Sequence, residues 1–282
     1  MVSRRDLAKL AVGAALAAPA IIAASSRASA QAGESTFDRV KRTKVLRAAA
    51  LPGESPYFNK DPATGEWSGM AIEMAKDIAK VFEAKLEYIE STYGNSVLDL
   101  QADKVDIAFS LNPTPARALV IDFTHPVFMH GFGHVGSKTF KASTWPEMNK
   151  PNVRIAVDIG SVHEVSARRF APKAEITGYK TRDDCVLAVQ SGRADSVILA
   201  VILGLTAVKK NPQLGQYQIL NNPLVQLPSC IGIRRETDKR WRDFLDAWVD
   251  YNRGIGQIRE WMVNGLALNG VTAEDIPPEV AF

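Results

Sequence analysis

Arg117 is the residue in this sequence whose surroundings best suit it to bind an anion. It follows a turn that contains Pro113 and Pro115, and proline fixes the backbone conformation of a first helical turn. Free amide groups at a helix start point toward an anion, and a guanidinium beside them can hold a carboxylate through two parallel hydrogen bonds. From the residues alone, the alternative is a surface arginine that pairs with Asp122.

Two other pairs of residues could carry chemistry. His130 and His134 would lie on one face of a strand, about 13 Å apart at ~3.3 Å per residue, which is too far to share a metal ion. We therefore expect no metal site and no cofactor. Cys185 and Cys230 are the two cysteines of the chain. They could form a disulfide in an oxidising compartment or remain two buried thiols.

Strand-like and helix-like segments alternate in two successive runs along the chain. These elements must position Arg117 and the other candidate residues. Met70, Ile72, Met74 and Ile78 recur at helical spacing, and Ser96 is a candidate N-cap. Two successive β-α-β-α runs predict two α/β lobes, and two C-terminal amphipathic helices are expected to pack back onto one of them. The expected strands are 44–50, 86–89, 105–109, 153–157, 174–176 and 196–199, and the expected helices are 69–82, 96–102, 161–170, 182–191, 201–209, 238–252 and 255–264.

Charge and composition exclude several classes of protein. The 282 residues are 46% hydrophobic and 23% charged, which is ordinary for a globular protein. The net charge of +3 arises in the first 30 residues, and the rest of the chain has equal numbers of basic and acidic residues. This balance gives no support for nucleic-acid binding, which needs a cationic excess.

Residues 1–30 have the layout of a signal peptide. A charged start precedes an apolar stretch at 10–24, and Ala28-Ser29-Ala30 forms a typical cleavage site. The start, from Ser3 to Lys9, resembles the twin-arginine export motif through Arg4 and Arg5, although an ordinary secretory signal remains the alternative. The apolar stretch is shorter than the roughly 20 residues of a spanning helix. We therefore expect a protein exported to the periplasm.

Several short stretches occur in an order that resembles one known family. They are Pro56-Tyr57-Phe58, 69–74 (GMAIEM), 103–108 (DKVDIA), 114–126 (TPARALVIDFTHP), 159–161 (IGS) and 190–195 (QSGRAD). Their order and spacing resemble the family 3 solute-binding proteins of ABC importers, the polar amino-acid-binding family. No single stretch is specific, but together they span the chain after the signal peptide.

This resemblance implies a type II periplasmic-binding-protein fold, in which two α/β lobes enclose a ligand cleft and close by hinge motion. Two crossing strands would join the lobes near 128–136 and 227–233. Lobe one would comprise residues 35–130 plus 234–282, and lobe two residues 131–233.

The resemblance also implies roles for a set of cleft residues. Arg117 would hold the ligand's carboxylate, with Ser110 and Asn112 completing the clamp, although Asn112 could equally form a turn. Tyr93 would cover the ligand, or simply pack. Ser161 could cap a helix, contact the ligand, or do both, and His163 faces either the cleft or solvent. The full expected binding set is Arg117, Asn112, Ser110, Tyr93, Ser161, Val162, His163 and Glu54.

Two positions depart from the family pattern. Ala200 stands where amino-acid binders have an aspartate that neutralises the ligand's ammonium, and we expect its side chain to point into the cleft. Glu54 replaces a frequent aromatic residue, and it could bind a cationic group or be an exposed acid in a turn. A buried ammonium without a carboxylate is strongly disfavoured. An ordinary α-amino acid is therefore in doubt as the ligand.

The expected function is capture of a small polar carboxylate-bearing solute, an amino acid or a related organic acid, for an ABC permease and its ATPase. We expect a monomer without enzymatic activity. The alternative is a periplasmic dehydratase resembling cyclohexadienyl dehydratase, in which Glu54 or Glu164 would supply an acid with a pKa raised by burial. A receptor's sensing domain is disfavoured because no later segment of the chain could span a membrane.

Overall fold

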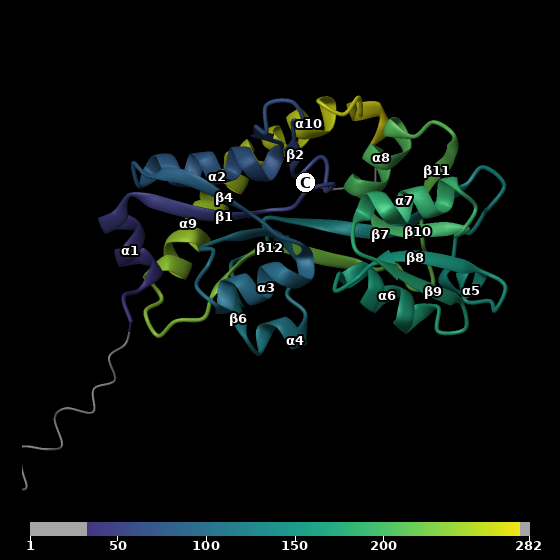
Figure 1. Cartoon of the computed structure of the whole chain (residues 1–282), viewed down its shortest axis with the longest axis horizontal. Helices are drawn as coiled ribbons and strands as arrows, with labels where there is room; N and C mark the ends of the chain where they lie inside the picture. The colour runs from purple at the N-terminus through teal and green to yellow at the C-terminus, as the bar shows by residue number, and fades with distance from the viewer. Residues whose placement is uncertain (1–32, 277–282) are drawn as a thin grey trace, which may run out of the picture. The chain divides into compact units, whose positions relative to one another are not determined.

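Two long strands link two groups of helices and strands in this protein (Figure 1). The computed structural model describes residues 33–276, and the predicted signal peptide lies outside them. The elements, in chain order, are α1 (Thr36–Thr43), β1 (Val45–Ala50), β2 (Asn59–Lys60), β3 (Trp67–Ser68), α2 (Met70–Val81), β4 (Lys85–Glu90), α3 (Tyr93–Gln101), β5 (Ala108–Leu111), α4 (Pro115–Ala118), β6 (Ile121–Phe123), β7 (Phe128–Ser137), α5 (Trp145–Met148), β8 (Arg154–Asp158), α6 (Val162–Phe170), β9 (Glu175–Tyr179), α7 (Arg182–Gln190), β10 (Ser196–Ala200), α8 (Val201–Lys210), β11 (Leu214–Ile219), β12 (Gln226–Arg234), α9 (Arg240–Gly254), α10 (Gln257–Ala267) and the 3₁₀ helix η1 (Ala273–Asp275).

Lobe one is built on the parallel pair β1–β4, to which Ile107 adds a bridge at Ala48. Helix α2 buries Met70, Ile72 and Ile78 in the core of this lobe. The C-terminal helices pack here too, because α10 contacts both α2 and α9, as the upper part of Figure 1 shows. The expectation that these helices return to an existing lobe is confirmed.

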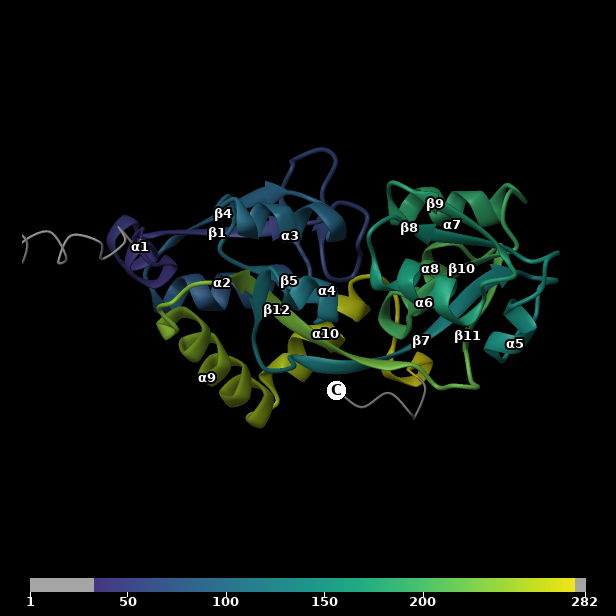
Figure 2. The same cartoon turned by 90° about the horizontal axis from the view of Figure 1, so that it is seen from below.

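Lobe two is a sheet in which β10, β8 and β9 run parallel and β7 and β11 pair antiparallel at its other edge. Helices α5 to α8 surround it (Figure 2). The alternation of strand and helix in residues 153–210 matches the sequence prediction, and no boundary differs by more than three residues.

Strands β7 and β12 each belong to both lobes. The first part of β7 pairs with β12 over Phe128–Gly131, and its remainder pairs with β10 and β11. The second half of β12 pairs with β5 and β6 of lobe one. These are the two predicted crossing strands, and the two-lobed α/β class is confirmed. The exact lobe boundaries stay a prediction.

Four helices that begin beside the cleft start at hydroxyl N-caps. The side chains of Thr92, Thr114, Ser161 and Thr181 accept hydrogen bonds from backbone amides of α3, α4, α6 and α7, which satisfies donors that a helix start leaves free. The predicted cap of α3 was wrong: Ser96 lies inside that helix, and its hydroxyl donates to the Tyr93 carbonyl. The helix therefore begins three residues earlier, which brings Tyr93 into its first turn.

Strand β5, in contrast, begins three residues later than the sequence predicted, at Ala108 rather than at residue 105. Its extension to Leu111 carries Ser110 to the cleft, with a left-handed backbone at φ 60°. Within residues 33–276, no helix combines the length and the apolar character needed to cross a bilayer.

Candidate functional site

A small cavity lies between the two lobes. Its volume is about 10 Å³, roughly the space that one water molecule requires. The residues around it come from both lobes and include six of the eight predicted ones. They are Tyr57, Tyr93, Ser110, Asn112, Arg117, His130, Val162, His163 and Leu203. The predicted residues are thus largely brought together, in a cleft that is closed in this structure.

Arg117 is partly buried at the cavity wall, where its guanidinium is hydrogen-bonded to two backbone carbonyls. Its Nη1 donates to the Asn112 carbonyl at 3.1 Å and its Nη2 to the Gly160 carbonyl at 3.0 Å. Within residues 33–276, no acidic side chain forms an ion pair with it. Asp122 instead pairs with Arg235 and Lys239, at 2.8 and 2.6 Å, so the alternative of a surface Arg117–Asp122 pair is wrong. Burial lowers the pKa of Arg117, and the attraction of Tyr93 and Asp158 offsets this shift only in part.

Asn112 and His130 form a hydrogen-bonded pair in this wall. The Asn112 amide nitrogen donates to the Pro228 carbonyl at 2.7 Å and lies 3.0 Å from His130 Nε2. An amide nitrogen only donates, so Nε2 accepts and Nδ1 carries the proton. Burial lowers the pKa of His130 to about 3, which keeps the ring neutral. Within the described part of the chain, its buried Nδ1 has no hydrogen-bond partner.

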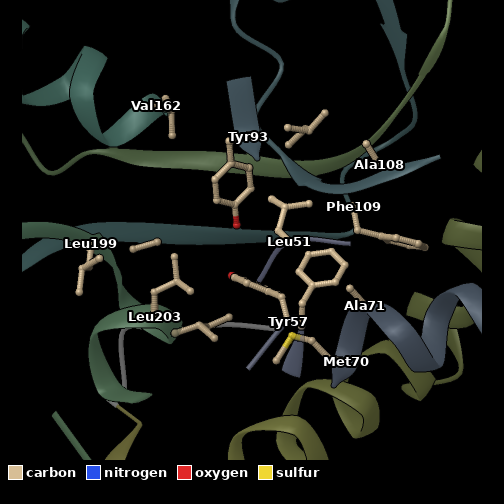
Figure 3. Close-up of a cluster of buried hydrophobic side chains, with 14 of the residues drawn as sticks. Leu51, Tyr57, Met70, Ala71, Tyr93, Ala108, Phe109, Val162, Leu199 and Leu203 are labelled. Atoms are coloured by element: carbon tan, nitrogen blue, oxygen red, sulfur yellow. The ribbon is translucent and has the colours of Figure 1, made fainter. Parts of the chain in front are cut away.

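Two tyrosines enclose the cavity from lobe one. Tyr93, in the first turn of α3, and Tyr57 point their hydroxyl groups toward a common space near Leu203 (Figure 3). Tyr57 is almost fully buried, and no described residue gives its hydroxyl group a hydrogen-bond partner. Gly69 holds the backbone of Tyr57 close, because a Cβ at Gly69 would come within 2.6 Å of the Tyr57 carbonyl oxygen. A ligand with an acceptor oxygen would satisfy the Tyr57 hydroxyl.

The lobe-two side of the cavity is the start of α6. Ser161 caps this helix through the Glu164 amide, and its hydroxyl donates to Asp158 at 2.8 Å. Val162 lines the cavity, whereas Ser161 does not. His163 is buried, and its Nε2 accepts a hydrogen bond from the Ala200 amide at 3.0 Å. The alternative of a solvated His163 is therefore wrong.

Glu54 is neither exposed nor free to bind a ligand cation. Its side chain is 6% exposed, and Arg182 Nε lies 3.3 and 3.2 Å from its two oxygens. The same guanidinium donates through Nη2 to Asp158 at 2.6 Å, and the Tyr93 ring lies 6.0 Å from it. Glu54 belongs to lobe one and Arg182 to lobe two, so this ion pair crosses the cleft. The alternative of an exposed acid in a turn is therefore wrong.

The two acids of this cluster, Glu54 and Asp158, differ in protonation. Burial raises the pKa of Glu54 to about 8 against the attraction of Arg182. Burial acts on Asp158 as well, but Arg182 and hydrogen bonds from His163 and Ser161 hold the pKa of Asp158 well below its usual range. Asp158 has the shorter bond to the shared guanidinium, which explains why it is the carboxylate that remains ionised.

Backbone contacts also join the lobes. Gly160 has φ +77°, and a Cβ there would lie 3.1 Å from Gly94 Cα across the cleft. A Cβ at Gly53 would lie 2.9 Å from an Asp183 oxygen. The closed cleft therefore depends on small residues at its edge.

Three further features named from the sequence involve buried residues. Ala200 is fully buried and is not among the residues that line the cavity. Cys185 and Cys230 are free buried thiols, so the disulfide alternative is wrong. His134 contacts the Ser196 hydroxyl at 2.7 Å and the Ala142 carbonyl at 2.8 Å. Within residues 33–276, no group of three or more His, Cys, Asp or Glu side chains is placed to hold a metal ion.

Sequence reasoning missed five residues of the site, one of which is the apolar Leu203 at the cavity wall. Tyr57 was noted only as part of a motif, and His130 only as a candidate metal ligand. Arg182 and Asp158 were not singled out. One feature of the sequence could have pointed to Arg182. It directly follows a helix N-cap, as Tyr93 and Val162 do in their helices.

This fold and site define a two-lobed binding protein. Residues 46–260 match the family described as bacterial extracellular solute-binding proteins, family 3, and the chain belongs to this family. It is 26% identical over 257 residues to a cyclohexadienyl dehydratase of Pseudomonas aeruginosa, covering 90% of this chain and 94% of that one. It is 24% identical over 210 residues to a glutamine-binding protein of Geobacillus stearothermophilus, and the match covers 73% of this chain and 79% of that protein.

Solved structures agree on the fold. The ancestral amino acid-binding protein AncCDT-1, a precursor of cyclohexadienyl dehydratase, superposes with a TM-score of 0.74 at 25% identity, covering 82% of this chain and all of that one. A solute receptor for L-cysteine of Neisseria gonorrhoeae superposes with a TM-score of 0.77 at 19% identity, and the match covers 88% of this chain and all of that one. The chain thus has the fold and the solute-binding role of its family.

Proposed function

We propose that this protein captures a small carboxylate-bearing solute and delivers it to an ABC importer. The observation that carries the proposal is the Arg117 guanidinium, which lies at the wall of the interlobe cavity without an acidic partner within residues 33–276. A desolvated arginine favours a carboxylate, which it can hold through two hydrogen bonds.

Four helix starts strengthen this interpretation. Tyr93, Arg117, Val162 and Arg182 all lie in the first turns of helices that begin around the cleft. The start of a helix carries partial positive charge, which favours an anion. The cavity of about 10 Å³ is smaller than a carboxylate, so the side chains around it must move to admit the ligand.

A dehydratase is the second candidate function, because one relative is a cyclohexadienyl dehydratase and Glu54 holds a proton at neutral pH. However, Glu54 is paired with Arg182 and does not line the cavity. Glu164 accepts from the Gly160 amide and from Arg168. Neither acid faces the space beside Arg117, which favours a protein without enzymatic activity. If the purified protein formed product from prephenate or arogenate, the dehydratase function would be correct.

The proposed cellular setting follows from the sequence and the family. The pattern of residues 1–30 favours export to the periplasm by the twin-arginine route. There the protein would act as a monomer whose closed form docks on a permease and its ATPase, without a cofactor.

A thermal-shift screen tests the proposed function. The full chain is heated with carboxylates, amino acids and amines in turn. A ligand that binds only the folded state raises its stability by about 2.7 kcal/mol at one hundred times Kd. We expect carboxylates to raise the melting temperature and simple amines to leave it unchanged. A response to amines alone would contradict the proposal.

A further inference from the structure

Arg182 occupies a site that has the composition of a cation-binding site. Its guanidinium lies between Glu54 of lobe one and Asp158 of lobe two, at 3.2 and 2.6 Å. The Tyr93 ring is 6.0 Å away. Two carboxylates and an aromatic face are the groups that bind guanidinium and ammonium ions in proteins. Here the bound cation belongs to the chain itself.

Burial makes this arrangement costly to break. The side chains of Arg182, Glu54 and Asp158 are 4–6% exposed. Removing one partner of such a pair leaves an uncompensated buried charge, which is strongly destabilising. Asp158, which remains ionised, therefore requires the positive charge of Arg182. His163 Nδ1 also lies 3.5 Å from Asp158, but burial lowers the pKa of His163, so this histidine does not replace the charge of Arg182.

Tyr93 and His163, which both contact Arg182, line the cavity, and this cavity offers a ligand hydrogen-bond donors and positive charge. Within the described part of the chain, no acidic side chain lines this cavity. The Tyr57 hydroxyl and His130 Nδ1 face no partner within residues 33–276, and Arg117 has no counter-ion there. Ala200 supplies no charge. An ammonium group would meet the Arg117 charge without any compensating carboxylate, which is unfavourable.

We propose that Arg182 fills the cation subsite of the cleft and thereby excludes ligands with an ammonium group, so that the solute is a hydroxy or oxo acid. Its carboxylate binds Arg117, which rests on the proposed function, and its additional oxygen accepts from Tyr57 and His130. Arg182 is in this sense a specificity-determining residue that touches no ligand.

The first experiment asks whether the site between Glu54 and Asp158 binds a free guanidinium. In the Arg182→Ala variant, ethylguanidinium supplies the atoms that the substitution removes. It can enter through a surface hollow of about 280 Å³ that both acids line. We expect a saturable rise in the melting temperature of this variant with ethylguanidinium. The wild-type chain should not respond.

Arg154→Ala is the matched control, because Arg154 forms an ion pair with Asp195 in the same lobe but its side chain is 40% exposed. It should not respond to ethylguanidinium. If Arg182→Ala does not fold, its refolding yield with and without ethylguanidinium is measured instead. A melting temperature or yield that ethylguanidinium leaves unchanged would overturn the proposal.

The second experiment measures selectivity in sets of ligands that differ in one group. Calorimetric titration compares glutamate with 2-hydroxyglutarate and 2-oxoglutarate, and alanine with lactate and pyruvate. We expect the hydroxy or oxo acid of a set to bind at least tenfold more tightly than its amino acid. Equal or tighter binding of the amino acid would overturn the proposed selectivity.

Failure of the proposed function would look different from failure of this inference. If Arg117 does not bind the carboxylate, Arg117→Ala retains the affinity of the wild-type chain for every ligand that binds. If no acid in these sets binds at all, that result counts against the proposed solute class. The ethylguanidinium titration uses none of these ligands. It therefore tests the Arg182 subsite independently of the calorimetric results.

Discussion

Arg117 and Gly160 are hydrogen-bonded across the cleft, with Nη2 of the arginine 3.0 Å from the glycine carbonyl oxygen. Arg117 lies in α4 of lobe one, and Gly160 precedes α6 of lobe two. Gly160 also lies against Gly94, where a Cβ would have only 3.1 Å of space. The residue proposed to hold the ligand therefore contacts the same backbone segment that closes the cleft, and on this proposal ligand binding would be coupled to lobe closure.

Gly160→Ala should weaken ligand binding beyond its effect on stability. An alanine at φ +77° is strained by about 1–2 kcal/mol, and its Cβ would also push Gly94 away. Gly192→Ala is the matched control, because Gly192 has φ +70° with nothing within 4 Å of a built Cβ. Both variants should lose similar stability in urea denaturation, but only Gly160→Ala should lose affinity. Equal affinities would show that closure does not depend on the Gly94–Gly160 contact.

Arg117→Ala should abolish tight binding and leave the fold intact. Truncating one partner of a desolvated charge pair typically costs about 2–5 kcal/mol, which corresponds to roughly 30-fold to several-thousand-fold in Kd. Calorimetric titration with the ligand identified by the thermal-shift screen measures the loss. Arg235→Ala, which removes a half-exposed partner of Asp122, should bind like the wild-type chain. An affinity of Arg117→Ala within a few-fold of wild type would place the carboxylate elsewhere.

The sequence predicted the fold well because local signals and core periodicity agreed. The α2 pattern of Met70, Ile72 and Ile78 predicted the buried helix face, and Arg117 was found because prolines mark its turn. Glu54 and Arg182 could not be paired in the same way. They are 128 residues apart in sequence and meet only after the lobes close. Burial of such a charge cannot be inferred from local pattern, because an isolated Glu or Arg is almost always exposed.

Both cysteines should be unreactive thiols in the folded protein. Burial raises the pKa of Cys185 and of Cys230 to about 12, so neither forms appreciable thiolate near neutral pH. Titration with a thiol reagent should detect both thiols rapidly in denaturant and neither rapidly without it. A reducing agent should leave the melting temperature unchanged. A lowered melting temperature after reduction would indicate a disulfide and contradict the prediction.

Export should depend on the paired arginines of the N-terminal segment. Replacing Arg4 and Arg5 with lysine should trap the precursor in the cytoplasm if the twin-arginine route is used. Cell fractionation of the wild-type and double-variant chains measures this. Lys41→Arg, a conservative change on an exposed position of α1, serves as a control and should be exported normally. Unimpaired secretion of the double variant would leave an ordinary secretory signal as the explanation.

Glu54 should make the folded state less stable as the pH rises above neutrality. Its pKa is about 8 in the folded chain and near 4.5 when unperturbed, so between these values the folded state binds a proton that the unfolded state has lost. The free energy of unfolding must then fall with rising pH in this window. Burial lowers the pKa values of His130 and His163, so below about pH 6.5 these two groups make the free energy of unfolding rise with pH. In that range they partly cancel the effect of Glu54.

The Glu54→Gln variant isolates this contribution between pH 6.5 and pH 8. The amide keeps an acceptor toward Arg182 but does not titrate. Relative to the variant, the wild-type chain should lose roughly 1.6 kcal/mol of unfolding free energy across this interval, because the slope is at most about 1.4 kcal/mol per pH unit and falls to half of that at the pKa. Urea denaturation at the two pH values gives the difference. Parallel pH dependence in the two proteins would mean that Glu54 is already ionised at pH 6.5, and that the attraction of Arg182 outweighs its burial.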